Sequence, residues 1–300
     1  MLLFAIPRLL KFKTEIIIVQ SPPLFLALSA WFMNKIVSAK YILNLSDLRP
    51  RAFFDLGFLQ KSSFLYRIFL KIEKFLYKKS ELILGQSQEI ITHVKTIFPD
   101  AKTLLYRNAV EQNGFIDNMP NFETPLKIVY AGLLGISQGF LKLCQEINFK
   151  ELGVELHIYG DGLERTEIEH YLKKVTQKSI FLHEALQNEQ LKKELVKYDI
   201  ALVVQKKQIY GTVPSKIYEA MALGLPILLA GKGESAEIIN ENKVGWTALP
   251  SDYEMLKESI IKIKKLDKKT LILISDEAKR VAKELFNQEI FVKRLVEKLS

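Results

Sequence analysis

Short apolar runs alternate with longer amphipathic segments in the first third of the chain. The runs predict buried strands at residues 15–20, 41–45, 82–84 and 103–106. The longer segments have the apolar spacing of helices, at residues 24–37, about 63–79 and about 87–97. Because strands and helices alternate, the pattern favours a parallel sheet with helical crossovers.

The same alternation restarts after a polar segment, residues 108–125, that is rich in Asn and Pro. Further strands are predicted at residues 128–130, 154–159, 180–182, 200–204, 227–230 and 244–249, and residues 251–299 have a helical pattern almost throughout. The sequence therefore predicts an α/β protein with two doubly wound, Rossmann-like domains and a ligand at the carboxyl ends of the strands. The expected boundaries are 1–110 for the first domain, 111–125 for a linker, 126–285 for the second domain, and 286–300 for a C-terminal helix that packs back on the first domain.

Residues 211–233, GTVPSKIYEAMALGLPILLAGKG, predict a loop, a helix and a buried strand in succession. Thr212 and Ser215 offer capping hydroxyl groups, and Pro214 suits a first turn, where the helix needs no N–H. Gly224 is expected to end the helix in a left-handed conformation.

The start of this helix has the features of an anion site. Its free N–H groups suit a phosphate. Lys216 and Glu219 are three residues apart and share a face, so one can meet an anion while the other accepts hydrogen bonds from sugar hydroxyls. An ordinary helix and strand with a solvated polar face explain the same pattern equally well.

The segment PSKIYEAMALGLPIL, followed by GKGESAEII, resembles the signature of family 4 retaining glycosyltransferases of the GT-B type, in the branch that builds bacterial surface polysaccharides. The resemblance implies that Glu219 holds the ribose of a nucleotide sugar. The family's usual second glutamate lies eight positions earlier, where this chain has Gly211.

The same resemblance implies two further sets of donor contacts, both made by the backbone. Groups at Gly233 and Glu234 would reach the donor sugar, and groups around Ala185 and Leu186, in FLHEALQNEQL, would meet the nucleotide base. His183 precedes that segment and is expected to be structural.

The resemblance also implies a first domain that is incomplete. Family members normally begin with a strand and a glycine-rich loop, followed by further units, before a segment such as EIIIVQSPPL. The sequence predicts about four strands here, so the domain is expected to be shortened at its N-terminus. We expect donor binding, which rests on the second domain, to survive this shortening, and transfer to be weak or absent.

Two other segments supply candidate site residues. Small and polar residues between a strand and a helix would let backbone N–H groups approach a pyrophosphate, although turn formation explains them equally well: Gly132, Gly135, Ser137 and Gln138. No basic residue lies in that segment, so Lys216 is the expected cation for the diphosphate.

Asp47 follows a strand in LSDLRP, which resembles the RDLWP-type segment of the family. A carboxylate there can orient or deprotonate an acceptor hydroxyl. Capping of the following turn is the structural alternative. Asp47, Lys216 and Glu219 are the expected catalytic residues.

Composition narrows the chemistry. Hydrophobic residues make up 48% of the chain and charged residues 26%, as in globular proteins with full cores. The single cysteine, Cys144, excludes an intrachain disulfide and fits a reducing compartment. The four histidines are scattered, so the sequence has no metal-site spacing and no metal is expected. No cofactor is expected either, because the nucleotide sugar would be a substrate.

The net charge of +9 is concentrated at one end of the chain. Residues 1–110 contain 16 Lys and Arg against 7 Asp and Glu, whereas the rest contains 27 of each kind. One basic stripe on the helix at 63–79 suits an anionic membrane, and a solvated helix face is its alternative: Arg67, Lys71, Lys74 and Lys78. No apolar run reaches the length of about 18–20 residues that crosses a bilayer, and no motif indicates nucleic acid. The expected location is the cytoplasm, at the inner face of the cytoplasmic membrane.

The sequence thus predicts a metal-independent, retaining glycosyltransferase of cell-surface glycan biosynthesis. It would transfer a hexosyl or N-acetylhexosaminyl group from a nucleotide-diphosphate sugar, UDP-linked, to a lipid-linked saccharide or polysaccharide acceptor. Two alternatives remain open, a nucleotide-sugar-binding remnant without turnover and a GT-B nucleotide-sugar epimerase.

Overall fold

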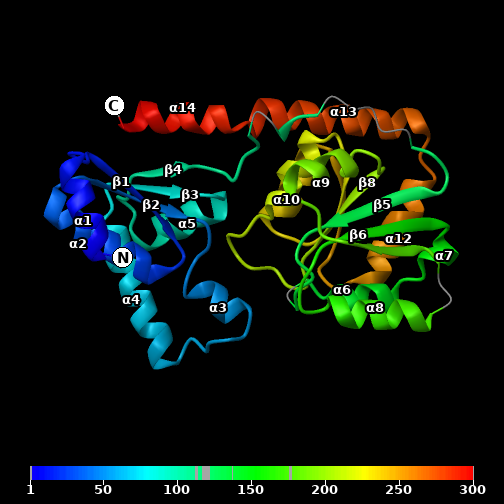
Figure 1. The fold of residues 1–300 in the computed structure, drawn as a ribbon, viewed down its shortest axis with the longest axis horizontal. Helices are drawn as coiled ribbons and strands as arrows, with labels where there is room; N and C mark the ends of the chain where they lie inside the picture. The colour runs from blue at the N-terminus through cyan, green and yellow to red at the C-terminus, as the bar shows by residue number, and fades with distance from the viewer. Residues whose placement is uncertain (1, 112–113, 117–121, 137, 176–177, 300) are drawn as a thin grey trace. The chain divides into compact units, whose positions relative to one another are not determined.

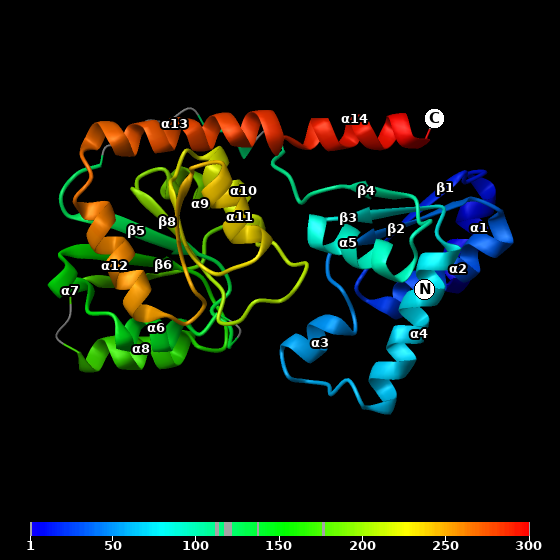
Figure 2. The same ribbon diagram turned by 180° about the vertical axis from the view of Figure 1, so that it is seen from behind.

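The computed structural model describes residues 2–111, 114–116, 122–136, 138–175 and 178–299, and the chain forms two units (Figures 1 and 2). Unit 1 comprises Met1–Arg107, Ile209–Val213 and Lys293–Ser300, and unit 2 comprises Asn108–Gln208 and Pro214–Val292. The chain therefore returns twice to unit 1 after it has entered unit 2. The sequence pattern does not single out the first of these returns, Ile209–Val213.

Unit 1 is built on a four-stranded parallel sheet in the order β1-β2-β3-β4. Its strands are β1 (Ile16–Ser21), β2 (Lys40–Leu45), β3 (Leu82–Gly85) and β4 (Thr103–Leu105). The helices among them are α1 (Leu2–Lys11), α2 (Leu24–Val37), α3 (Arg51–Asp55), α4 (Phe64–Lys79) and α5 (Gln88–Ile97). All four residues of β3 are buried, as expected for an inner strand of a parallel sheet.

Alternate residues of β2 enter two different cores. Leu43 and Leu45 pack with residues of α2, α4 and α5 on one face of the sheet. Ile42 points to the other face, where it packs with Leu295 and Leu299 from α14 (Gln288–Leu299). The last turns of α14 therefore complete the second core of unit 1.

Unit 2 contains a six-stranded parallel sheet in the order β10-β9-β8-β5-β6-β7. The strands are β5 (Leu126–Ala131), β6 (Val154–Tyr159), β7 (Ile180–His183), β8 (Ile200–Val204), β9 (Ile227–Ala230) and β10 (Gly245–Ala248). The helices are α6 (Phe140–Glu146), α7 (Phe149–Leu152), α8 (Arg165–Lys174), α9 (Asn188–Leu195), α10 (Ser215–Ala222), α11 (Glu234–Glu241), α12 (Tyr253–Lys264) and α13 (Lys268–Leu285). Helices cover both faces of this sheet (Figure 1).

The order of the strands in unit 2 creates one switch point. The chain runs outward from β5 to β6 and β7, and then returns to the other side of β5 as β8. Loops that leave the carboxyl ends of β5 and β8 consequently diverge toward opposite faces. Open α/β sheets bind their ligands at this place.

The predicted fold class is confirmed, since both sheets are parallel and helices connect their strands. The spacing of apolar residues does not predict α3 or α7, because helices of five and four residues are too short to show a period. Within the described residues, no helix is long and apolar enough to cross a membrane.

Gly224, just after α10, adopts a left-handed backbone conformation that favours glycine. Gly224 follows this helix with φ +68°, as expected, and its carbonyl accepts a hydrogen bond from Ser275 Oγ at 2.6 Å. A Cβ in this left-handed conformation costs about 1–2 kcal/mol, and Asn tolerates it better than Ala.

We therefore expect Gly224→Ala to lower the free energy of unfolding by about 1–2 kcal/mol, and Gly224→Asn to lower it less. Chemical denaturation of the full chain measures both. A larger loss for Asn than for Ala would show that side-chain volume against Lys279, which an added Cβ would contact, matters more than φ.

Candidate functional site

The first turn of α10 has no side-chain cap. Pro214 occupies the N-cap position, while Thr212 Oγ1 donates to Asp47 Oδ1 at 2.7 Å and Ser215 Oγ donates to Glu219 Oε1 at 3.1 Å. The prediction that these hydroxyl groups cap the helix is therefore wrong. No acceptor among the described residues is assigned to the N–H groups of Ser215 and Lys216, so both can bind an external acceptor.

Lys216 and Glu219 share one face of α10, as predicted. Lys216 Nζ lies 2.7 Å from Glu219 Oε2, and the two side chains are 38% and 41% exposed. An ion pair at this exposure contributes about 0–1 kcal/mol. A ligand that offers a phosphate to the lysine and a hydroxyl to the glutamate can replace it at little cost.

The pair borders a cavity of about 30 Å³ at the switch point. Its walls come from β5, β8, α9 and α10, and its polar lining consists of Lys216 and Glu219. The remaining lining is apolar, for example Ala131 at the end of β5 and Val203 near the end of β8. The only charged side chains that line this cavity are thus those that the sequence singles out.

Two buried oxygen atoms near the ends of β8 and β9 lack a hydrogen-bond partner among the described residues, Gln205 Oε1 and Ser235 Oγ. Gln205 follows β8, and a Cβ added to Gly231 would lie 2.5 Å from its Oε1. Ser235 lies in the first turn of α11, after Gly233 at the N-cap and the buried Glu234. Buried polar atoms are nearly always paired, so these two indicate where a ligand or water completes the site.

The sequence reasoning missed Gln205 and Ser235. A signal for Gln205 was present, because it comes directly after a wholly apolar predicted strand at the expected ligand edge. Ser235 carries no comparable signal, since a serine in a first helical turn is common.

The glycine-rich segment lies between β5 and α6, and Ser137 falls outside the described residues. Gly132 N–H donates to Tyr159 O at 3.0 Å, and Gln138 N–H donates to Gly135 O at 3.0 Å. Of the three described candidates, Gly135 alone has an N–H group with no described acceptor. The segment therefore offers fewer donors to a pyrophosphate than the sequence predicts.

A carboxylate already occupies the start of α6. Glu164 Oε2 accepts from the N–H groups of Phe140 at 2.7 Å and Leu141 at 3.4 Å. An anionic ligand at this helix end would have to displace it. A basic side chain that the sequence reasoning missed lies next to this segment, because a Cβ on Gly139 would be 3.2 Å from Lys206 Cδ.

Ala185 and Leu186 follow β7 in the turn before α9. Ala185 is exposed and Leu186 is half-buried. The described hydrogen bonds assign no acceptor to the N–H group of either residue. The turn can therefore hydrogen-bond a ligand through its backbone.

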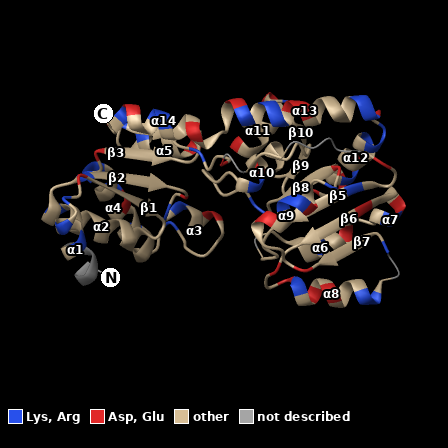
Figure 3. Ribbon diagram, turned by 45° about the horizontal axis from the view of Figure 1, so that its top comes forward, with Lys and Arg blue, Asp and Glu red and all other residues tan. Residues whose placement is uncertain are grey.

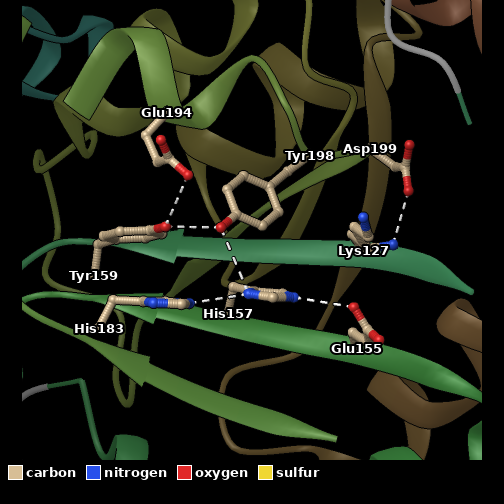
Figure 4. Close-up of polar contacts among 8 residues, drawn as sticks. All are labelled: Lys127, Glu155, His157, Tyr159, His183, Glu194, Tyr198 and Asp199. Carbon is tan, nitrogen blue, oxygen red and sulfur yellow. Dashed lines mark hydrogen bonds and ion pairs between the residues drawn. The ribbon is translucent and has the colours of Figure 1, made fainter. Parts of the chain in front are cut away.

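A polar network lies beside this turn (Figure 4). His157 Nδ1 lies 3.0 Å from His183 Nε2, and His157 Nε2 lies 3.2 Å from Glu155 Oε2. Tyr198 OH lies 2.8 Å from Tyr159 OH and 3.5 Å from His157 Nδ1. Since a carboxylate only accepts, His157 donates from Nε2, and its Nδ1 then accepts from the His183 Nε2–H.

Burial keeps both imidazoles neutral. It lowers the pKa of His157, although the hydrogen bond to Glu155 acts in the opposite direction. It also lowers the pKa of His183. The expectation of a structural role for His183 agrees with its contacts, which include ring stacking on Tyr159 at 4.4 Å between centroids.

Asp47 and Thr212 lie in unit 1, where their hydrogen bond belongs to a small network. Gly211 N–H donates to Glu89 Oε2 at 2.5 Å, and Ser87 Oγ donates to Gly211 O at 2.7 Å. Gly211 has φ +87°, and a Cβ there would approach Ile90 Cγ1 to 2.9 Å. The backbone at this position therefore disfavours the glutamate that the resembled family usually has.

The predicted residues thus fall into two groups. Unit 2 holds Lys216, Glu219 and the other donor-side residues from Pro214 onward, together with the glycine-rich segment and the turn after β7. Unit 1 holds Asp47 and Thr212. Within the described ranges, no three His, Cys, Asp or Glu side chains are grouped as metal ligands.

Two all-parallel α/β units, with a site at the switch point of the second, define a protein of the GT-B class. The sequence profile described as glycosyl transferases group 1 matches residues 116–280, more than half of the chain. The chain therefore belongs to this family.

One sequence relative and two solved structures of similar fold match the chain. The probable glycosyltransferase WbjE of Pseudomonas aeruginosa is 24% identical over 273 residues, which are 86% of this chain and 68% of that protein. The structure of Anabaena Alr3699/HepE in complex with UDP aligns with a TM-score of 0.79 at 15% identity, over 99% of this chain and 81% of that one. The pneumococcal O-GlcNAc transferase GtfA, in complex with UDP and GlcNAc, aligns with a TM-score of 0.73 at 12% identity, over 98% of this chain. The chain spans 59% of the length of that transferase.

The neutral histidines predict a pH dependence of stability. Because the folded pKa values of His157 and His183 lie below the ordinary 6.5, protons bind the unfolded chain more tightly. The contribution of these two histidines to the free energy of unfolding should be greatest above about pH 7. It should decrease as the pH falls through 6.5 toward the pKa values of the folded state. Denaturation midpoints between pH 8 and pH 5 measure this decline.

A double variant, His157→Gln with His183→Gln, should flatten this decline. His170→Gln is the matched control, because His170 is exposed on α8, and it should leave the decline as in the parent. An unchanged decline in the double variant would assign the pH dependence to other groups.

Proposed function

We propose that this chain is a retaining glycosyltransferase that takes its sugar from a nucleotide-diphosphate donor, UDP-linked. The observation that carries the proposal is the uncapped start of α10 beside the cavity at the switch point, with Lys216 and Glu219 on its first turns. Membership of the glycosyl transferases group 1 family supports it. The UDP bound in the structures of HepE and GtfA is in keeping with the same donor class.

In this proposal α10 handles the donor. The free N–H groups of Ser215 and Lys216 and the Lys216 ammonium would stabilise the departing diphosphate, whose charge grows as the sugar leaves. Glu219 would accept hydrogen bonds from the ribose hydroxyls. Positive charge for the leaving group then comes from the protein itself, so the proposed reaction needs no metal.

The neighbouring elements would hold the rest of the donor. Gly233 and Glu234, with the unpartnered oxygens of Gln205 and Ser235, would contact the hexosyl or N-acetylhexosaminyl group. Gly135, with a contribution from Lys206, would face the pyrophosphate. Such fixed donors act mainly by orientation.

On the acceptor side we propose a role for Asp47. Its carboxylate accepts from Thr212 Oγ1, which fixes one oxygen and leaves the other for a substrate hydroxyl. The proposed acceptor is a lipid-linked saccharide or a polysaccharide in cell-surface glycan biosynthesis.

Incubation with a panel of nucleotide sugars and lipid-linked acceptors, in a buffer with a metal chelator, tests the whole proposal. Release of nucleoside diphosphate that depends on the acceptor, with the anomeric configuration retained, would support the proposal even at the low rate that the sequence leads us to expect. Saturable donor binding without turnover would indicate a binding protein instead, and interconversion of nucleotide sugars without an acceptor would indicate an epimerase.

Glu219→Ala should weaken the binding of the donor nucleotide by about 1–3 kcal/mol, because the ribose loses a charged hydrogen-bond acceptor. The matched control is Glu254→Ala. Glu254 also pairs at 2.7 Å with a lysine three positions away, Lys257, but this lysine follows the glutamate and the pair lies on α12. Calorimetry on folded variants measures both, and an equal affinity in the Glu219 variant and the parent would remove the assignment.

We also propose that the chain binds the inner face of the cytoplasmic membrane peripherally, through α4. The side chains of Arg67, Lys71, Lys74 and Lys78 are exposed on this helix, and Phe64 and Leu65 at its start are 75% and 53% exposed. Ile72 and Phe75 instead pack against the core of unit 1. The apolar part of such a contact would therefore come from the start of α4 and its basic part from the stripe.

Replacing the four basic residues of the stripe by Gln should reduce sedimentation with anionic vesicles at low salt and leave nucleotide binding unchanged. The matched control removes the same charge from four exposed lysines around the connection between α12 and α13: Lys262, Lys265, Lys268 and Lys269. Both signs of charge occur on these two helices (Figure 3). Equal sedimentation of the two quadruple variants would show that net charge alone decides.

A further inference from the structure

Arg165, the first residue of α8, ties together the carboxyl ends of β6 and β7. Its Nη1 donates to Gly160 O at 2.6 Å and to His183 O at 2.9 Å. Its Nη2 donates to Glu184 Oε1 at 2.9 Å, and its Nε lies 3.4 Å from Glu169 Oε1. The Arg165 side chain is 13% exposed and its two carbonyl contacts are partly buried, whereas Glu184 is 89% exposed.

His183 is held from a second side as well. Its ring stacks on Tyr159, with 12° between the planes, and its Nε2 contacts His157 Nδ1 at 3.0 Å. The backbone carbonyl of His183 is thus fixed by Arg165 while its ring is fixed by β6 residues. Two residues further along, Ala185 and Leu186 have N–H groups with no described acceptor. The end of β7 is therefore held firmly, and the turn that follows it has backbone N–H groups that can bind a ligand.

The position of this turn suits the base of a nucleotide. Neighbouring strands lie about 4.8 Å apart, so the end of β7 is about 10 Å from the end of β5 across β6. A nucleoside diphosphate whose phosphates lie at the switch point, near Lys216, extends over such a distance. The charged end of the site is at α10, whereas the turn after β7 offers backbone groups, as the edge of a planar heterocycle requires.

We infer that Arg165 is a positioning residue for the donor base, which acts through the turn at residues 184–186 and does not itself touch the nucleotide. The inference rests on the proposed function. Backbone groups discriminate between bases only if the turn is fixed, because hydrogen bonds weaken steeply with misalignment. The forked guanidinium reaches two carbonyl groups at once, which a lysine ammonium on a flexible stem does less well.

The test compares Arg165→Ala and Arg165→Lys with the parent in the full chain. Calorimetry gives the affinity for UDP, GDP and ADP, and for inorganic pyrophosphate as a probe that lacks a base. We expect Arg165→Ala to weaken the preferred nucleoside diphosphate about tenfold, as for the loss of one or two hydrogen bonds. Its preference among the three nucleotides should shrink by a similar factor, while pyrophosphate affinity stays unchanged. Arg165→Lys should lie between this variant and the parent.

Arg280→Ala is the matched control. Arg280 also contacts two glutamates, Glu277 and Glu284, but on the surface of α13, and its loss should change none of the four affinities. If Arg165→Ala does not fold, Arg165→Lys carries the test by the same comparison.

Three outcomes separate the hypotheses. An equal loss for nucleotides and pyrophosphate would show a general structural role for Arg165 and overturn the inference. An unchanged preference among the nucleotides would overturn it as well. If the parent itself binds no nucleoside diphosphate, the proposed function fails first, and that result is visible before any variant is measured.

Discussion

The parallel pairing of β8 with β5 decides where unit 2 can bind a ligand. Ile128 pairs with Ile200 in this register, so the chain that has moved outward through β6 and β7 returns to the centre of the sheet. The loops after β5 and β8 diverge only because of this return. The cavity beside Lys216 and Glu219 and the buried Oε1 atom of Gln205, which follows β8, both lie along this one pair of strands.

The two helices that begin beside the switch point, α6 and α10, differ in the charge at their N-termini. At α6 the helix N–H groups already bind Glu164, whose carboxylate supplies the anion from within the protein. At α10 the N-cap is Pro214, which has no side-chain acceptor, and Lys216 adds a positive charge. Since a bound carboxylate must be displaced before another anion can enter, an anionic ligand should favour α10. The glycine-rich segment before α6 is the more familiar phosphate-binding pattern, yet its own protein contacts make it the weaker candidate here.

Features that depend on neighbouring residues could be predicted from the sequence, and features that depend on distant residues could not. The strands, the helix at α10, its end at Gly224 and the shared face of Lys216 and Glu219 follow from local spacing. The hydroxyl caps of α10 were predicted wrongly, because Thr212 instead bonds Asp47, which is 165 residues away. Glu164 and Arg165 gave no signal for the same reason, since their partners lie on other strands and helices.

The two ends of the candidate donor site, the backbone after β7 and the ion pair on α10, differ in how firmly the protein holds them. In the proposed function this difference would give one end the role of selectivity and the other the role of affinity. The end at β7 is fixed by Arg165 and by the stacked rings of His183 and Tyr159, so a ligand that binds there orders little further and loses little entropy. The end at α10 consists of an exposed ion pair that must open. Opening costs about 0–1 kcal/mol, whereas a hydrogen bond to a charged group returns about 1.5–3 kcal/mol. In the proposed function, the charged end at α10 would therefore supply affinity for any diphosphate, and selection among nucleotides would fall to the fixed, uncharged backbone that follows β7.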